Sequence, residues 1–211
     1  VRLNTPSEVA PVSYFDAIFA RRTIRKFNTQ PLTKQELSDL LYYSFSEIKK
    51  RKEFVSENIK ENLWMFSNSH SLWFNLLVVI HNVEGIENGL YKYDYMNHSL
   101  LMVKDQKFSY EKIQEVEIGQ NFMVNVGVSL FITIDFYNLF WRYRYPGAYK
   151  AALITNGELA QKITSVAMAF GLGSFLTPAI VDENQEKYLG TLPLVEEVIY
   201  YLGVGKYDKL Q

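Results

Sequence analysis

The sequence predicts an α+β fold in which helices flank an antiparallel or mixed sheet, and it assigns residues 1–211 to a single domain. Helical and strand patterns are interspersed without a regular βαβ alternation, which argues against a parallel α/β sheet. A chain of 211 residues is long enough to bury one core, and its length favours one domain over two. No repeat, low-complexity segment or linker divides it.

Two helices open the chain. A short helix is expected over 13–21, with the serine at its start as the N-cap. Thr33 and Glu36 have the spacing of a capping box, and apolar residues at helical spacing continue the second helix to Phe45. The following stretch, 47–62, is rich in Lys and Glu, which predicts a solvated helix or a mobile connection.

The middle of the chain alternates strands with one helix. An apolar run predicts a strand over 76–80, and a hairpin is expected from 90–95 and 99–103 around an Asn-His turn. A helix over 110–122 then precedes a strand over 126–135.

The C-terminal half contributes a long helix and a last strand. The most apolar run, Val126–Phe140, has 15 residues, whereas a bilayer span needs about 20, so it predicts a buried strand and no membrane association. A helix is expected over 151–170, and Gly171 is a natural residue to end it. Residues 198–202 read as the last strand.

Composition excludes several function classes. The 22 Lys and Arg nearly balance the 23 Asp and Glu, so nucleic acid and anionic lipid are not expected partners. The absence of Cys excludes disulfides and thiolate chemistry, and it fits the cytoplasmic location that we expect. The N-terminus has no secretion signal, and a start at Val suggests a trimmed sequence or fragment. His70, His81 and His98 are too far apart to predict a metal site, and structural roles are expected for them.

The most specific local feature is the basic segment, residues 21–27, which reads Arg-Arg-Thr-Ile-Arg-Lys-Phe. Guanidinium groups match phosphate oxygens, and the alternation across Thr23 and Arg25 points both at one ligand. The competing interpretation is a helix C-terminus whose cations favour its dipole and the solvent. Charge alone does not separate the two interpretations.

The order of residues around the basic segment resembles the opening of nitroreductases. The stretch 17–27, followed by Pro-Leu-Thr at 31–33 and a capped helix, carries this resemblance. In that family the cluster binds flavin mononucleotide (FMN), so the resemblance implies contacts to the ribityl phosphate and the pyrimidine end from four residues: Arg21, Arg22, Thr23 and Arg25. Cations there would also stabilise the anionic reduced flavin.

Later motifs resemble the SagB-type branch, the dehydrogenases of thiazole/oxazole-modified peptide pathways. The segment 82–94 holds a Gly-Leu-Tyr-x-Tyr hairpin that recurs in that branch, although aromatic cross-strand pairs alone would also explain it. Before it, residues 67–73 stand where nitroreductases carry Pro-Ser; the proline is missing, and Asn68 and Ser69 are the cofactor-binding candidates.

The block 149–173 also resembles this branch, where the corresponding helix lies in the dimer core, so a homodimer is expected. By the same resemblance, Thr177 and Ala179 lie near the flavin ring and its N5, since Pro178 has no N–H to offer. Lys206 is a candidate for the phosphate, the alternative being a solvated terminal lysine.

The branch uses a Lys-Tyr pair before the long helix for proton removal, but residues 140–149 contain no lysine. The pair aligns with Arg142-Tyr143 or with Arg144-Tyr145, and arginine is a poor general base. Three explanations remain open: a tyrosine acts as the base beside an Arg that lowers its pKa, the Arg binds an anionic substrate, or the reaction has been lost.

Three functions follow. The first is FMN-dependent dehydrogenation of azoline rings in a peptide substrate, with cyclodehydratase-type partner proteins. The second is an NAD(P)H-dependent nitroreductase acting on small molecules. The third is a catalytically degenerate scaffold subunit of a peptide-modifying complex, which the missing lysine and proline motivate.

Overall fold

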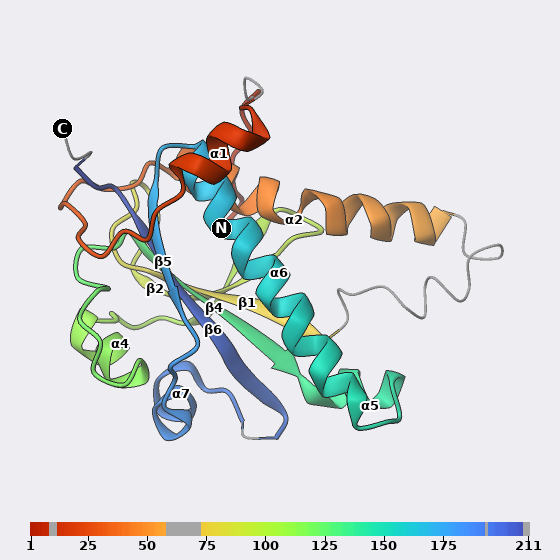
Figure 1. The fold of residues 1–211 in the computed structure, drawn as a ribbon. Coiled ribbons are helices and arrows are strands. Elements are labelled where there is room, and N and C mark those ends of the chain that lie inside the picture. Colours follow the sequence, from red (N-terminus) through yellow and green to blue (C-terminus); the bar gives the residue numbers. More distant parts are fainter. Residues whose placement is uncertain (9–11, 58–72, 193, 209–211) are drawn as a thin grey trace.

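The computed structural model describes residues 1–8, 12–57, 73–192 and 194–208. A six-stranded sheet runs through the middle of the molecule in the order β3-β2-β1-β4-β6-β5, and every neighbouring pair is antiparallel (Figure 1). The predicted α+β class with an antiparallel sheet is therefore confirmed. The strands are β1 (Phe74–Ile80), β2 (Gly89–Asp94), β3 (Ser99–Lys104), β4 (Val128–Asp135), β5 (Gly173–Thr177) and β6 (Glu196–Gly205).

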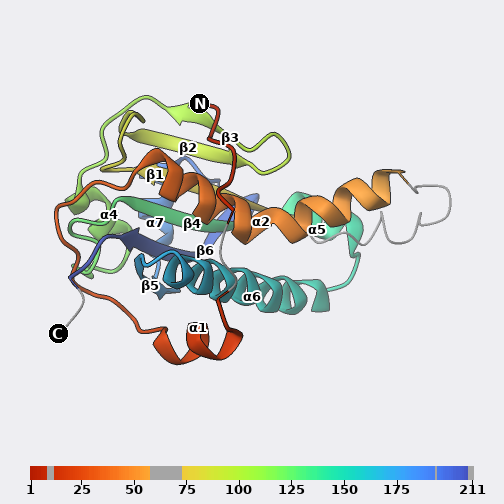
Figure 2. The same ribbon diagram turned by 90° about the horizontal axis from the view of Figure 1, so that it is seen from above.

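Helices cover both faces of this sheet. Helices α2 and α6 pack on one face and α4 and α7 on the other, while α1 lies outside α6 (Figures 1 and 2). No helix of the described ranges is both long and apolar enough to cross a bilayer. The helices are α1 (Tyr14–Ala20), α2 (Lys34–Glu57), α4 (Tyr110–Val116), α5 (Phe136–Arg142), α6 (Gly147–Ala169) and α7 (Asp182–Leu189).

The core is divided by the sheet into two apolar layers, and residues 76–80 of β1 show why a strand between them is continuously apolar. Val78 belongs to the layer under α2 and α6, whereas Leu77 and Val79 belong to the layer under α4. Because successive side chains of a strand point to opposite faces, a strand that is buried on both faces needs apolar residues at every position.

Two of the three expected helix caps are formed, whereas Ser13 precedes α1 without a side-chain cap hydrogen bond. At the start of α2, Glu36 N–H donates to the Thr33 hydroxyl at 3.1 Å and Thr33 N–H donates to the Glu36 carboxylate at 2.7 Å, which completes the capping box. Gly171 follows α6 with a φ of 72°, and its N–H donates to the Met168 carbonyl at 2.9 Å. The N–H of Leu172 donates to the Ala167 carbonyl, so the two bonds form a Schellman motif.

Several predicted boundaries were wrong. The predicted strand 126–135 corresponds to β4, but the rest of the apolar run to 140 was not predicted to be a helix: the Asp135 carboxylate accepts a hydrogen bond from Asn138 N–H at 2.9 Å and caps α5. Helix α2 continues to Glu57, so the solvated-helix interpretation of 47–62 holds for its described part. Helix α4 is shorter than 110–122.

The remaining corrections concern the C-terminal half. Helix α6 begins at Gly147, four residues before the predicted start. Strand β5 and helix α7 were not predicted, and β6 is longer at both ends than 198–202. Strand β5 is short and follows the α6 cap directly, which gives the sequence pattern little length to reveal it.

Candidate functional site

The basic segment crosses the ends of two C-terminal strands. It leaves α1 at Arg21, whose N–H caps the helix on the Ala17 carbonyl at 3.1 Å. Ile24 N–H then donates to the Ser174 carbonyl of β5 at 2.9 Å. Asn28 N–H donates to the carbonyl of Lys206, just after β6, also at 2.9 Å. Backbone hydrogen bonds therefore hold the segment extended while leaving most of its side chains free to point outward.

Inward-facing apolar residues anchor the segment. Phe27 is buried in the core layer beneath α4. Ile24 is half-buried against Gly173 and Tyr207. A Cβ on Gly173 would lie 2.8 Å from the Tyr207 ring and 3.0 Å from the Ile24 side chain, so this close packing requires glycine.

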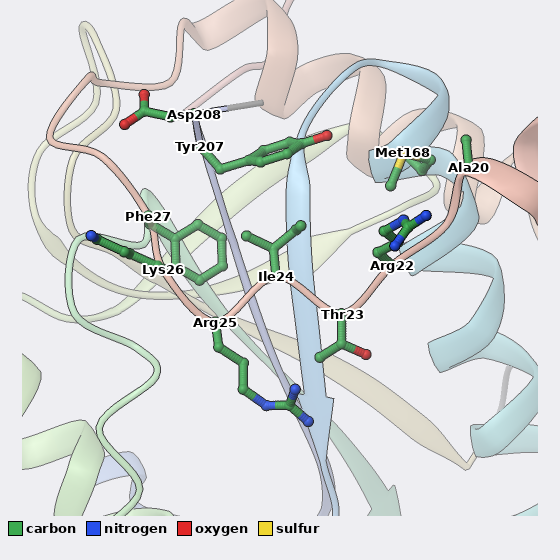
Figure 3. Close-up of a pocket in the computed structure, with 10 residues that line it drawn as sticks. All are labelled: Ala20, Arg22, Thr23, Ile24, Arg25, Lys26, Phe27, Met168, Tyr207 and Asp208. Carbon is green, nitrogen blue, oxygen red and sulfur yellow. The ribbon is translucent and has the colours of Figure 1, made fainter. Parts of the chain in front are cut away.

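A pocket of about 770 Å³ lies along the basic segment (Figure 3). Thr23 and Arg25 point to one side of the segment, Ile24 points toward the Tyr207 ring on the other, and Arg22 lies beside Met168 (Figure 3). The pocket is lined by Ala20, Arg22, Thr23, Ile24, Arg25, Lys26, Phe27, Met168, Tyr207 and Asp208.

The pocket is electrostatically suited to an anion. Arg22, Arg25 and Lys26 are exposed, and within the described part of the chain none of them forms a salt bridge. The Arg25 guanidinium rests 5.3 Å from the centroid of the Phe122 ring. The one acidic lining residue, Asp208, is exposed and accepts a hydrogen bond from the Asn28 amide at 2.9 Å. Three cations with a neighbouring Thr hydroxyl fit a phosphate group.

The predicted cofactor residues fall into three groups. Arg22, Thr23 and Arg25 line the pocket, whereas Arg21 is half-buried and does not. Lys206 lies beside the segment, but its ammonium group pairs with the Glu36 carboxylate at 3.3 Å. Asn68 and Ser69 lie outside the described residues.

The segment after β5 is tied to α4. Thr177 is buried, and its hydroxyl accepts hydrogen bonds from Ala179 N–H at 3.1 Å and from the Gln120 amide at 3.2 Å. The N–H of Val181 donates to the Val116 carbonyl at 2.7 Å. Thr177 and Ala179 thus belong to a turn that hydrogen bonds hold in place, but neither residue lines the pocket.

The catalytic candidates lie at the other end of α6. Tyr143 is half-buried, with its ring 5.3 Å from the Trp73 ring and 5.4 Å from the Arg142 guanidinium. Burial lowers the pKa of Arg142, and the Tyr143 hydroxyl acts in the opposite direction. Arg144 and Tyr145 are exposed. The family's Lys-Tyr pair aligns with either Arg142-Tyr143 or Arg144-Tyr145, and only in the first pair are both side chains half-buried and in contact with each other.

The two halves of the predicted site are far apart within one chain. Met168, at the C-terminal end of α6, lines the pocket, whereas Tyr143 precedes the N-terminal end of the same helix. Figure 1 shows α1 and α5 at opposite ends of α6. With 23 residues and a rise of 1.5 Å per residue, α6 is roughly 34 Å long. Tyr143 and the basic segment of one chain therefore do not face one ligand.

Seven lining residues were not among the predicted site residues: Ala20, Ile24, Lys26, Phe27, Met168, Tyr207 and Asp208. Ile24, Lys26 and Phe27 belong to the basic segment, and Ala20 directly precedes it, but none of the four was assigned to the site. Met168 lies at the end of α6, and Tyr207 and Asp208 follow the end of β6. A prediction that the last strand continues to Gly205 would have placed residues 206–208 near the basic segment.

The two histidines of the described residues have structural partners. His81 lies between the Phe108 carbonyl and the Ser129 hydroxyl, and burial lowers its pKa to about 4. His98 contacts the hydroxyls of Ser38 and Tyr93, each at 2.8 Å, and burial lowers its pKa too.

Known proteins resemble this chain over most of its length. It is 26% identical over 196 residues to the trifolitoxin operon protein TfxC of Rhizobium leguminosarum bv. trifolii, a match that covers 89% of this chain and 54% of TfxC. The chain thus spans about half the length of this relative. The Nitroreductase family model matches residues 18–206.

Solved structures share the fold. A crystal structure from Ralstonia eutropha superimposes with a TM-score of 0.74 at 15% identity and covers 100% of this chain and 90% of its own. A chain of the E. coli microcin synthetase McbBCD complex with truncated pro-MccB17 bound gives a TM-score of 0.67 at 16% identity, covering 96% of this chain and 76% of its own. Because the family model matches far more than half of the residues, the chain belongs to the nitroreductase family.

Proposed function

We propose that the protein is an FMN-dependent oxidoreductase whose basic segment holds the flavin phosphate. The observation that carries this proposal is the pocket, in which Arg22, Arg25 and Lys26 present positive charge without ion pairs among the described residues. The lining suits a phosphate ester, because it combines guanidinium groups, an ammonium group and the Thr23 hydroxyl. Nitroreductases generally bind FMN, and membership of this family supports the same cofactor here.

We also propose that the working unit is a homodimer. The support is the separation of the basic segment from Tyr143 by the length of α6, since a second copy is needed to bring both to one flavin. Large apolar side chains are exposed at both ends of α6: Phe19 on α1 is 78% exposed and Trp141 on α5 is 68% exposed. Exposed aromatic groups of this size are typical of surfaces that bind another protein.

The reaction that we favour is the dehydrogenation of thiazoline or oxazoline rings in a peptide natural-product pathway. The similarity to the trifolitoxin operon protein TfxC and to a chain of the microcin synthetase complex supports this class of substrate. We expect a peptide substrate and cyclodehydratase-type partner proteins.

In this mechanism FMN, when bound, supplies the hydride acceptor. Tyr143 of the second subunit would remove the proton from the neighbouring ring carbon. Its ring packs against the Trp73 ring and lies 5.4 Å from the Arg142 guanidinium, so its position beside a cation is fixed. Arg142 itself holds its proton too firmly to serve as the base.

A second candidate is an NAD(P)H-dependent nitroreductase for small molecules. The observation in its favour is the absence of lysine from residues 140–149, because a flavin reductase does not need a base at that position.

One preparation separates these functions. The protein is loaded with FMN, made anaerobic, and mixed with NADPH or with an azoline-containing peptide while the flavin absorbance is followed. Bleaching by the peptide alone supports the dehydrogenase, and Tyr143→Phe should then slow bleaching while Tyr145→Phe serves as the matched control. Bleaching by NADPH alone supports the nitroreductase. A protein that never takes up FMN contradicts both and leaves the scaffold role.

A further inference from the structure

A buried acid lies next to the turn 177–181, which the resemblance to nitroreductases places near the flavin ring although it does not line the pocket. Glu117, at the C-terminal end of α4, is fully buried, and neither of its carboxyl oxygens forms a hydrogen bond of normal geometry in the structure. The hydroxyl of Tyr201, on β6, lies beside it and is also buried. An ionised carboxylate without hydrogen bonds is strongly disfavoured in such a place.

The directions of the hydrogen bonds that link His81, Ser129 and Tyr201 show which protonation state of Glu117 is favoured. His81 Nδ1 faces the Phe108 carbonyl at 3.3 Å, and because a carbonyl accepts, Nδ1 carries the proton of the neutral ring. His81 Nε2 must then accept from the Ser129 hydroxyl, 2.9 Å away. Ser129 Oγ, having used its proton, accepts from the Tyr201 hydroxyl at 3.0 Å.

It follows that Tyr201 directs its proton toward Ser129 and presents only lone pairs to Glu117. A carboxylate there would meet lone pairs, whereas a carboxylic acid donates to them. The opposite direction of these hydrogen bonds is disfavoured, because it would leave the unprotonated Nδ1 of His81 facing the Phe108 carbonyl.

Among the described residues, no cation acts on Glu117 or Tyr201. Tyr110 from α4 also faces Tyr201. On α7, Lys187 and Tyr188 contact Glu115 instead. Burial accordingly raises the pKa of Glu117 to about 9.

Helix α4 connects this acid to the turn after β5. Val116 and Gln120, on either side of Glu117, hold Val181 and Thr177 through their hydrogen bonds. Tyr201 is also the register partner of Thr177 in the sheet. A shift of α4 away from β6 would therefore move the turn 177–181.

We propose that Glu117 is a positioning residue that acts as a neutral carboxylic acid, bonding α4 to Tyr201 and so holding the turn 177–181 in place for FMN. Ionisation of Glu117 then loosens α4, and the turn with it. This inference rests on the proposed FMN site.

The test compares the wild type with Glu117→Gln, whose amide donates to Tyr201 as the acid does but never ionises. Glu186→Gln, at an exposed position of α7, is the matched control. In the FMN-free proteins, the thermal midpoint of the wild type and of the control should fall more steeply than that of Glu117→Gln as pH rises toward 9. The carboxylic-acid C=O stretch should be present in the wild-type infrared spectrum at neutral pH and absent from Glu117→Gln.

FMN affinity is the second readout. Between about pH 7 and about pH 9.5 the wild type should lose roughly tenfold more affinity than Glu117→Gln, and the comparison cancels any titration of FMN itself. Parallel stability profiles for the wild type and Glu117→Gln would overturn the neutral acid. Divergent stability with equal FMN affinity would overturn the link to the turn. If no variant binds FMN at any pH, the proposed function fails, while the FMN-free measurements still decide the protonation of Glu117.

Discussion

Replacing the pocket arginines one at a time should weaken FMN binding in a defined order. A charge-assisted hydrogen bond contributes about 1.5–3 kcal/mol, and about 1.4 kcal/mol corresponds to tenfold in affinity. Because Arg22 and Arg25 are exposed, we expect each of their hydrogen bonds to the phosphate to contribute a free energy near the lower end of this range. Arg25 must also leave the Phe122 ring to reach a phosphate, and such a contact is worth about 0.5–1 kcal/mol.

Arg22→Ala should therefore lower FMN affinity by roughly tenfold to a hundredfold, and Arg25→Ala by roughly tenfold or less. Arg51→Ala, which removes an exposed cation of α2, is the control and should leave the affinity unchanged. Titration of flavin fluorescence measures the dissociation constants at low and at physiological salt, where screening should narrow the differences. If both pocket variants bind FMN within about twofold of the wild type, the phosphate assignment is wrong.

Three further substitutions test the packing and the electrostatics. Gly173→Ala should destabilise the protein by about 1–3 kcal/mol in chemical denaturation, because the new Cβ would lie 2.8 Å from the Tyr207 ring; an unchanged midpoint would contradict this packing. Glu36→Ala removes the α2 capping partner and the ion pair with Lys206, so the free energy of unfolding should fall by about 1 kcal/mol or more, and no loss would argue against both contacts. Burial lowers the pKa of His81 to about 4, so as pH falls the unfolded chain binds a proton before the folded protein does. Between the ordinary histidine pKa and 4, the free energy of unfolding of the wild type should decrease by up to about 1.4 kcal/mol per pH unit. His81→Gln should remove this decrease, and identical acid profiles for the two proteins would contradict it.

Local sequence signals predicted the elements that depend on near neighbours. The Thr33–Glu36 capping box and Gly171 each act within a few residues, so their spacing was sufficient to place the start of α2 and the end of α6. The apolar run after Val126 predicted β4 but not α5, because the helix that Asp135 caps is as hydrophobic as the strand before it.

The site was predictable only where it lies in one continuous stretch. The basic segment could be recognised because its cations and Thr23 are adjacent in sequence. Met168 and Tyr207 reach the pocket from the ends of α6 and β6, and neither carries a local signal for it. The distance between the pocket and Tyr143 could not be foreseen either, since it depends on the path of α6 across the sheet.

The central claim is that the basic segment binds the phosphate of a flavin. Its most direct test is a side-by-side calorimetric titration of the wild-type protein with FMN and with riboflavin, which has the same ring system but no phosphate. Binding of FMN at least about a hundredfold tighter than riboflavin is expected, because two or more charge-assisted contacts depend on the phosphate. Equal affinities for the two ligands would contradict the claim.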